Sequence, residues 1–204
     1  LNSNNNTNMK HQIIIVHGGD SFNTYKEYLQ NLKEFKIDFS RFKTKSWKSS
    51  LNKKLGRNFD VISPSLPNSA NAKYIEWKIY FDKLTPFFAN DVILLGHSLG
   101  AIFLLKYLST NKLNKDILGL FLVSAPYPSK NIKEFSFKLN VENIEAQCKN
   151  IFMYHSQDDI VVGYRDFEQY KIKMRNAKFR TFKHRGHFNQ SSFPEIVRDI
   201  KNIS

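Results

Sequence analysis

The chain has 204 residues, of which 41% are hydrophobic and 14% aromatic, and this composition excludes a wholly disordered protein. It carries 31 Lys and Arg residues against 18 Asp and Glu residues, for a net charge of +13. The lysines are scattered, and the sequence has no zinc-ligand spacing, aromatic ribonucleoprotein signature or basic zipper. We therefore interpret the charge first as a solvated basic surface and second as a preference for acidic substrates or partners, and we expect no nucleic-acid binding.

The ends, the apolar runs and the cysteine content indicate the class of protein. Residues 1–9 are polar and lack the apolar centre of a signal peptide, so we expect a disordered leader followed by a single domain over 10–204. The longest apolar run is too short to cross a bilayer. The single cysteine, Cys148, excludes an internal disulfide and favours a cytoplasmic location. The oligomeric state is left open.

The first half of the chain predicts two strands and three helices. Residues 12–16 form a β-branched run, typical of a strand buried on both faces. Thr24 and Glu27 form a capping box for a helix that ends at Phe35 and carries an apolar face. The other elements are a helix over 47–55 closed by Gly56, a strand over 59–62, and a helix within 71–88 whose aromatic stripe is expected in the core, namely Tyr74, Trp77, Ile79, Tyr80, Phe81 and Leu84.

The second half alternates strands with helices. Strands are expected over 92–95, 117–123, 150–155 and 178–182, helices over 99–109, 164–174 and 194–203, and irregular chain over 125–149. This alternation predicts an α/β fold in which a mostly parallel sheet of about six strands is covered by helices on both faces, a three-layer α/β/α sandwich.

The most informative motif is Gly96-His97-Ser98-Leu99-Gly100, which lies between a predicted strand and a predicted helix. In that context the G-x-S-x-G pattern makes a nucleophile elbow, a tight turn that holds a serine in strained backbone. Glycine two residues before and after the serine removes side chains that would collide there. The turn would expose the Ser98 hydroxyl above the sheet edge.

Four predicted strand ends carry chemically useful residues, and such ends meet at one edge of a parallel sheet. They are the turn after His17, then Ser98, the pair Asp158 and Asp159, and His187. His187 would act as the general base for Ser98, and one of the two aspartates would hold the imidazole.

Developing negative charge on the substrate oxygen needs preset hydrogen-bond donors. We expect the Leu99 amide as one donor and an amide of the 18–20 turn, assigned to Gly19, as the other. His17, His97 and His155 are interpreted as structural residues. No group with metal-ligand spacing and no phosphate-binding glycine loop is present in the sequence, so neither a metal nor a cofactor is expected.

Several segments in this order resemble the α/β-hydrolase superfamily, and more narrowly the small serine hydrolases grouped with retinoblastoma-binding protein 9 and its bacterial relatives. The matching segments are 14–18, 64–68, 96–100, 122–125, 157–162 and 185–188. The resemblance implies a hydrolase with a minimal cap. It also implies Asp159 as the acid rather than Asp158, with Gly163 standing where the family usually has proline.

Residues 20–46 depart from that resemblance as a basic insertion that could form a partial cap. We expect a serine hydrolase of the carboxylesterase type, which would cleave a small ester, thioester or amide through an acyl-enzyme on Ser98. Two alternatives remain: a non-catalytic interaction module on a hydrolase scaffold, and an acyltransferase that uses the same residues.

Overall fold

Six parallel strands form the central sheet of the chain, seen here in a computed structural model that describes residues 10–128 and 132–204. The leader expected over residues 1–9 lies outside the described part. The strands lie in the order β2-β1-β3-β4-β5-β6. Their bounds are β1 His11–Val16, β2 Phe59–Ile62, β3 Val92–His97, β4 Ile117–Val123, β5 Ile151–Ser156 and β6 Lys178–Phe182.

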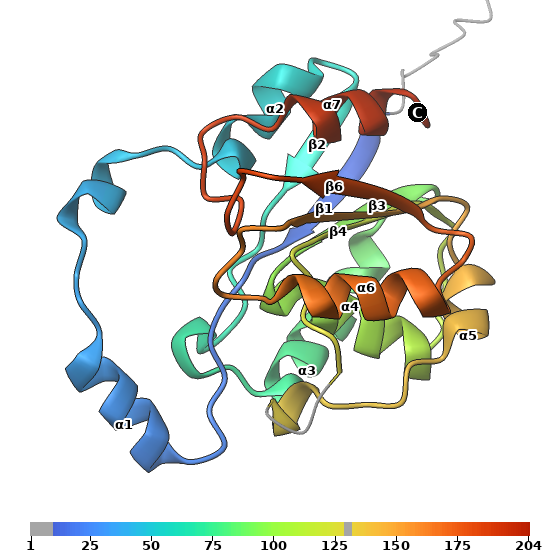
Figure 1. Ribbon diagram of the computed structural model, residues 1–204. Coiled ribbons are helices and arrows are strands. Elements are labelled where there is room, and N and C mark those ends of the chain that lie inside the picture. The colour runs from blue at the N-terminus through green and yellow to red at the C-terminus, as the bar shows by residue number, and fades with distance from the viewer. Residues whose placement is uncertain (1–9, 129–131) are drawn as a thin grey trace, which may run out of the picture.

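Helices cover both faces of this sheet (Figure 1). Two of them, α2 (Trp47–Leu55) and α7 (Pro194–Lys201), lie on one face. The other face is covered by α3 (Tyr74–Leu84), α4 (Leu99–Thr110), α5 (Val141–Glu145) and α6 (Tyr164–Lys173). The described short 3-10 helices are Phe39–Lys43, Ser69–Asn71, Thr85–Phe87 and Lys133–Phe135. The predicted three-layer α/β sandwich is confirmed.

The alternation of side chains along each strand divides the core into two parts. In β1, Ile13 and Ile15 face the layer of α2 and α7, whereas Ile14 and Val16 face the layer of α4. Every residue of β3 is buried, which explains its continuous apolar sequence. The core is therefore formed by aliphatic and aromatic side chains on both sides of a fully covered sheet centre.

Two expectations about the elements were wrong in detail. Residues 125–149 are not wholly irregular, because they include α5 and a 3-10 helix. The aromatic stripe of α3 is only partly core: Trp77 and Phe81 are buried, but Ile79 and Tyr80 are 53% and 39% exposed. The apolar side chains of α3 occupy more of its circumference than one face can bury, so those outside the Trp77 face remain in solvent.

The segment over residues 23–46, which we call the arm, stands apart from the body (Figure 1). It contains α1 (Tyr25–Glu34), whose predicted capping box is present: the Glu27 amide donates to the Thr24 hydroxyl over 3.1 Å, and Glu27 accepts from the Thr24 amide. None of the described side chains of the arm is buried. The apolar face of α1 was thus correctly predicted from its spacing, but none of its side chains is buried.

Among the residues that the structure describes, we find no helix with the length and apolar character needed to cross a membrane.

Candidate active site

Ser98 lies where the strand order reverses direction. The chain passes from β1 to β2 on one side and then crosses to β3 on the other, so the carboxyl ends of β1 and β3 lie side by side. Ligand sites in open α/β sheets form at such points. Ser98 directly follows β3 and precedes α4, with φ 55° and ψ −121°. This is backbone that a non-glycine residue adopts only under strain, as expected for an elbow serine.

The glycines around Ser98 are required by close packing. A β-carbon on Gly96 would lie 2.6 Å from the Ala101 Cα, and one on Gly100 would collide with the carbonyl oxygens of Val16 and His17. The steric reason inferred from the sequence is therefore present. The turn after β1 also lies close to the elbow, since a β-carbon on Gly18 would lie 3.2 Å from the Ser98 Cβ.

Asp159 and His187 meet at the same sheet edge. The His187 Nδ1 lies 2.9 Å from Oδ2 and 3.1 Å from Oδ1 of Asp159, although 27 residues separate the two in the chain. Asp159 is buried and follows β5, whereas the partly buried His187 follows β6. With Nδ1 engaged, the other ring nitrogen of His187 is free of the carboxylate.

The surroundings of Asp159 favour its ionised form. Burial alone would raise the pKa of this carboxyl, but hydrogen bonds from His187, from the Val162 amide and from the Ser124 hydroxyl outweigh burial and lower its pKa to about 2. The Val162 amide lies 3.0 Å from Oδ1, and the Ser124 hydroxyl donates to Oδ2 over 2.8 Å. A carboxylate held in this way is charged at neutral pH.

The neighbouring Asp158 has a different task. Its Oδ1 accepts from the Gly186 amide over 2.8 Å and from the Ser156 hydroxyl, while the Ser156 hydroxyl itself accepts from the Arg185 amide. Gly186 has a φ of 48°, the left-handed conformation that glycine adopts without strain. Asp158 therefore holds the backbone of the loop that carries His187, and Asp159 contacts the ring.

His97 links the elbow to the His187 loop. Its Nε2 lies 2.9 Å from the His187 carbonyl oxygen, and its Nδ1 lies 3.1 Å from the Lys48 Nζ. Burial, together with the charge of Lys48, holds the pKa of His97 well below its usual value, so the ring is neutral. Burial likewise lowers the pKa of Lys48 to about 8. Within the described residues, no hydrogen bond joins Ser98 to His187.

Sequence reasoning missed three residues that support this arrangement: Ser124, Lys48 and Trp47. The Trp47 indole donates to the Phe188 carbonyl over 2.8 Å, and the Trp47 amide donates to the Gln190 carbonyl over 2.9 Å. The signal for Ser124 was its place at the end of β4, beside the other strand ends. Trp47 and Lys48 gave no signal of this kind, because they are the first two residues of α2 and do not follow a strand.

His17, which directly follows β1, and His155 in β5 make structural contacts. His17 accepts from the Leu66 amide through Nε2 over 2.8 Å. His155 is fully buried, and its Nε2 lies 2.9 Å from the Val162 carbonyl oxygen. That bond supports the turn whose amides contact Asp159. His97, in contrast, contacts the candidate site directly through His187.

The two expected oxyanion donors are neighbours in space. A β-carbon on Gly19 would lie 3.5 Å from the Leu99 Cδ2. The Asp20 amide already donates to the Ser69 carbonyl over 2.9 Å, so this third amide of the turn is occupied within the protein. Leu99 and Gly19 remain the expected pair of amide donors beside Ser98.

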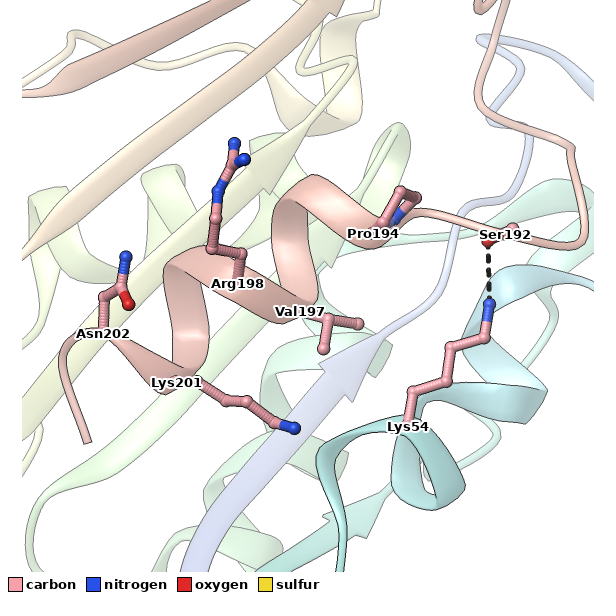
Figure 2. A pocket seen from close by; sticks show the side chains of 7 residues that line it. All are labelled: Lys54, Ser192, Pro194, Val197, Arg198, Lys201 and Asn202. Atoms are coloured by element: carbon pink, nitrogen blue, oxygen red, sulfur yellow. Dashed lines mark hydrogen bonds between the residues drawn. The ribbon is translucent and has the colours of Figure 1, made fainter.

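The described residues also form pockets whose linings include none of the candidate site residues. An open pocket of about 490 Å³ lies between α2 and α7 (Figure 2), lined among others by Lys54, Val197 and Lys201 and by none of the candidate residues. A second cavity, of about 560 Å³, lies between the arm and residues 66–76. Across residues 10–128 and 132–204, we find no group of three or more His, Cys, Asp or Glu side chains that could hold a metal ion.

Comparison with known proteins identifies the family. The serine hydrolase family model matches residues 39–196, which include Ser98, Asp159 and His187. The chain belongs to the serine hydrolase family. It is 28% identical over 158 residues to the serine hydrolase RBBP9 of Rattus norvegicus, a match that covers 71% of this chain and 78% of the relative.

Solved structures that are similar to this serine hydrolase have the same fold. The ydeN gene product of B. subtilis has a TM-score of 0.75 at 19% identity, over 95% of this chain and 98% of that chain. Est1E from Butyrivibrio proteoclasticus has a TM-score of 0.64 at 13% identity, over 97% of this chain and 88% of that chain. The predicted α/β-hydrolase fold is confirmed, and so is the resemblance to the retinoblastoma-binding protein 9 group.

Proposed function

We propose that this serine hydrolase cleaves a small ester, thioester or amide through an acyl-enzyme on Ser98. The observation that carries the proposal is the contact of His187 with Asp159 beside the strained Ser98 elbow. In the first step, His187 Nε2 accepts the Ser98 hydroxyl proton as the oxygen attacks the acyl carbon. Asp159 holds the imidazole tautomer with the proton on Nδ1 and stabilises the imidazolium that forms.

The tetrahedral intermediate places a negative charge on the former carbonyl oxygen. The amides of Leu99 and Gly19 would donate to it, and each such donor typically contributes about 100- to 1000-fold in rate. Collapse of this intermediate expels the leaving group, which takes the proton from His187. Water then attacks the acyl-enzyme by the same route and regenerates Ser98. A cytoplasmic location belongs to this proposal and rests on the single cysteine in the chain.

A fluorophosphonate probe tests the proposal, because it forms a stable adduct only with an activated serine. Intact-protein mass spectrometry should show one adduct on the natural chain and none on Ser98→Ala. His187→Ala should lower the labelling rate strongly while Ser98 remains in place. Absence of labelling in the natural chain, or labelling that persists in Ser98→Ala, would refute the assignment.

A further inference from the structure

The arm exposes more large apolar surface than a solvated segment needs. Tyr25, Leu29 and Leu32 on α1 and Phe35 at its C-cap recur at helical spacing and are between 38% and 68% exposed. The second half of the arm adds Ile37, Phe39 and Phe42, each at least 70% exposed. Contiguous apolar patches of this kind on soluble proteins mark interaction surfaces.

The charge of the arm indicates what kind of surface it fits. Residues 23–46 contain six basic and three acidic residues, and the whole chain has a net charge of +13. A second copy of the chain would bring the same positive charge, which disfavours pairing of two arms. A nucleic acid would satisfy the lysines but would offer no hydrocarbon for Leu29, Leu32 and Ile37. An anionic lipid surface supplies both negative charge and hydrocarbon.

Both ends of the arm are fixed to the body. At the start, the Phe22 amide donates to Asn71 Oδ1 over 3.3 Å, and the Lys73 ammonium donates to the Phe22 carbonyl over 3.0 Å. At the other end, the Trp47 indole donates to the Phe188 carbonyl in the loop that carries His187. A surface that binds the arm would therefore lie on the side of the molecule where Ser98 is located.

We propose that the arm docks this protein on an anionic lipid surface. The apolar face of α1 would enter the boundary between headgroups and acyl chains, and Phe39 and Phe42 would extend that contact. Lys26 and Lys33, which flank the apolar face of α1 in sequence, would reach the lipid phosphates with their long side chains. This docking concerns a surface outside the candidate active site and does not depend on hydrolase activity.

Vesicle sedimentation of the full chain tests the proposal. Vesicles of phosphatidylcholine with phosphatidylglycerol should bind the protein, whereas vesicles of phosphatidylcholine alone should bind it at least about tenfold more weakly, and high salt should weaken the anionic binding. The triple variant Leu29→Ser, Leu32→Ser, Phe35→Ser should lose at least about tenfold in partition.

A matched control removes three exposed apolar side chains elsewhere. Ile75, Ile79 and Ile172 are 58%, 53% and 60% exposed and lie on α3 and α6. Their combined exchange for serine should leave vesicle binding unchanged. Circular dichroism and thermal melting should show that both triple variants fold, since all six positions are exposed.

The variant Phe35→Trp tests which part of the arm inserts. The fluorescence emission of the new tryptophan should shift to the blue when anionic vesicles are added. The buried Trp47 and Trp77 should contribute a constant background. Three outcomes would overturn the proposal: no binding to anionic vesicles, equal loss in the arm and control variants, or a dimer by light scattering that the arm variant alone dissociates. The last outcome would assign the arm to a second copy of the chain.

Discussion

The His97 ring is joined to the backbone of His187 by a hydrogen bond of 2.9 Å, and the two rings lie 4.9 Å apart. The His187 carbonyl oxygen can only accept, so the Nε2 of His97 carries the proton and donates. The Nδ1 of the neutral ring then accepts from the Lys48 ammonium, which can only donate. The residue directly before Ser98 thus positions the loop of the proposed general base.

His97→Ala should reduce kcat without preventing the fold. Loss of the bond to the His187 carbonyl lets the loop shift, and a misplacement of about 1 Å can cost about 100-fold in rate. We expect a 10- to 100-fold fall in kcat for an ester substrate, on the order set by that misplacement. His184→Ala is the matched control, because His184 is exposed in the same loop and should leave kcat unchanged.

The two adjacent aspartates should differ sharply in activity. Asp159→Asn leaves the shape of the site but removes the charge beside the imidazole, and kcat should fall on the order of 10³- to 10⁴-fold. Asp158→Asn weakens the contacts with the Gly186 amide and the Ser156 hydroxyl but leaves Asp159 against the ring, so its fall should be much smaller. Steady-state ester hydrolysis measures both variants. An equal effect of the two would contradict the separate tasks that their contacts indicate.

The low pKa of Asp159 predicts how stability depends on pH. Its pKa of about 2 in the folded protein lies below the ordinary 3.8, so its contribution is complete above about pH 4 and is lost as the pH falls through 2. The full contribution is about 2 kcal/mol of unfolding free energy. Urea titrations at pH 5 and below pH 3 should show this loss in the natural chain and not in Asp159→Asn.

The backbone strain at Ser98 should be measurable as a difference in stability between two variants at this position. The backbone conformation of Ser98 suits glycine, and a strained residue costs of the order of 1–3 kcal/mol. Ser98→Gly should therefore be more stable to urea than Ser98→Ala by about 1 kcal/mol, once the greater freedom of glycine in the unfolded chain is subtracted. Both variants lack the hydroxyl. A glycine variant that is less stable than the alanine variant would show that the elbow is unstrained.

The lowered pKa of Lys48 should reduce the free energy of unfolding at neutral pH. Its pKa falls from 10.5 to about 8 on folding, so the unfolded chain binds one proton more between these values and stability rises with pH across that window. Relative to Lys48→Met, the free energy of unfolding of the natural chain should rise by about 1 to 2 kcal/mol between pH 7.5 and pH 10. This is less than the energy equivalent of the whole pKa shift, because Lys48 is only partly buried and solvent screens its charge. Parallel curves for the two proteins would contradict the lowered pKa.

Local signals predicted most of the sheet. Buried strands such as 12–16 and 117–123 are visible as β-branched and apolar runs, and the glycine spacing around Ser98 reports a steric requirement that the structure contains. The meeting of His187 with one of the two aspartates was also accessible, because strand ends in a parallel sheet converge on one edge, while the choice of Asp159 came from the family resemblance. Their catalytic roles remain predictions.

The contacts that the sequence did not reveal are tertiary ones. Nothing in the local pattern shows that Trp47 donates to the Phe188 carbonyl, or that Lys48 reaches His97, because the partners lie far apart in the chain. Periodicity predicted that Tyr25 and Leu29 share a face of α1 but could not tell whether another element covers it. The same reason explains the exposure of Ile79, which has an apolar side chain and no neighbour to pack against.

The arm leaves the body at Phe22 and rejoins it at Trp47, and none of its described side chains contributes to either half of the core. The intervening sequence is thus free to diverge in length and character at little cost to folding. Exchange of this one surface segment could therefore change what such a serine hydrolase binds in the cell, without a change to the residues of its candidate active site. The same two junctions offer an engineer a natural place to graft a targeting peptide.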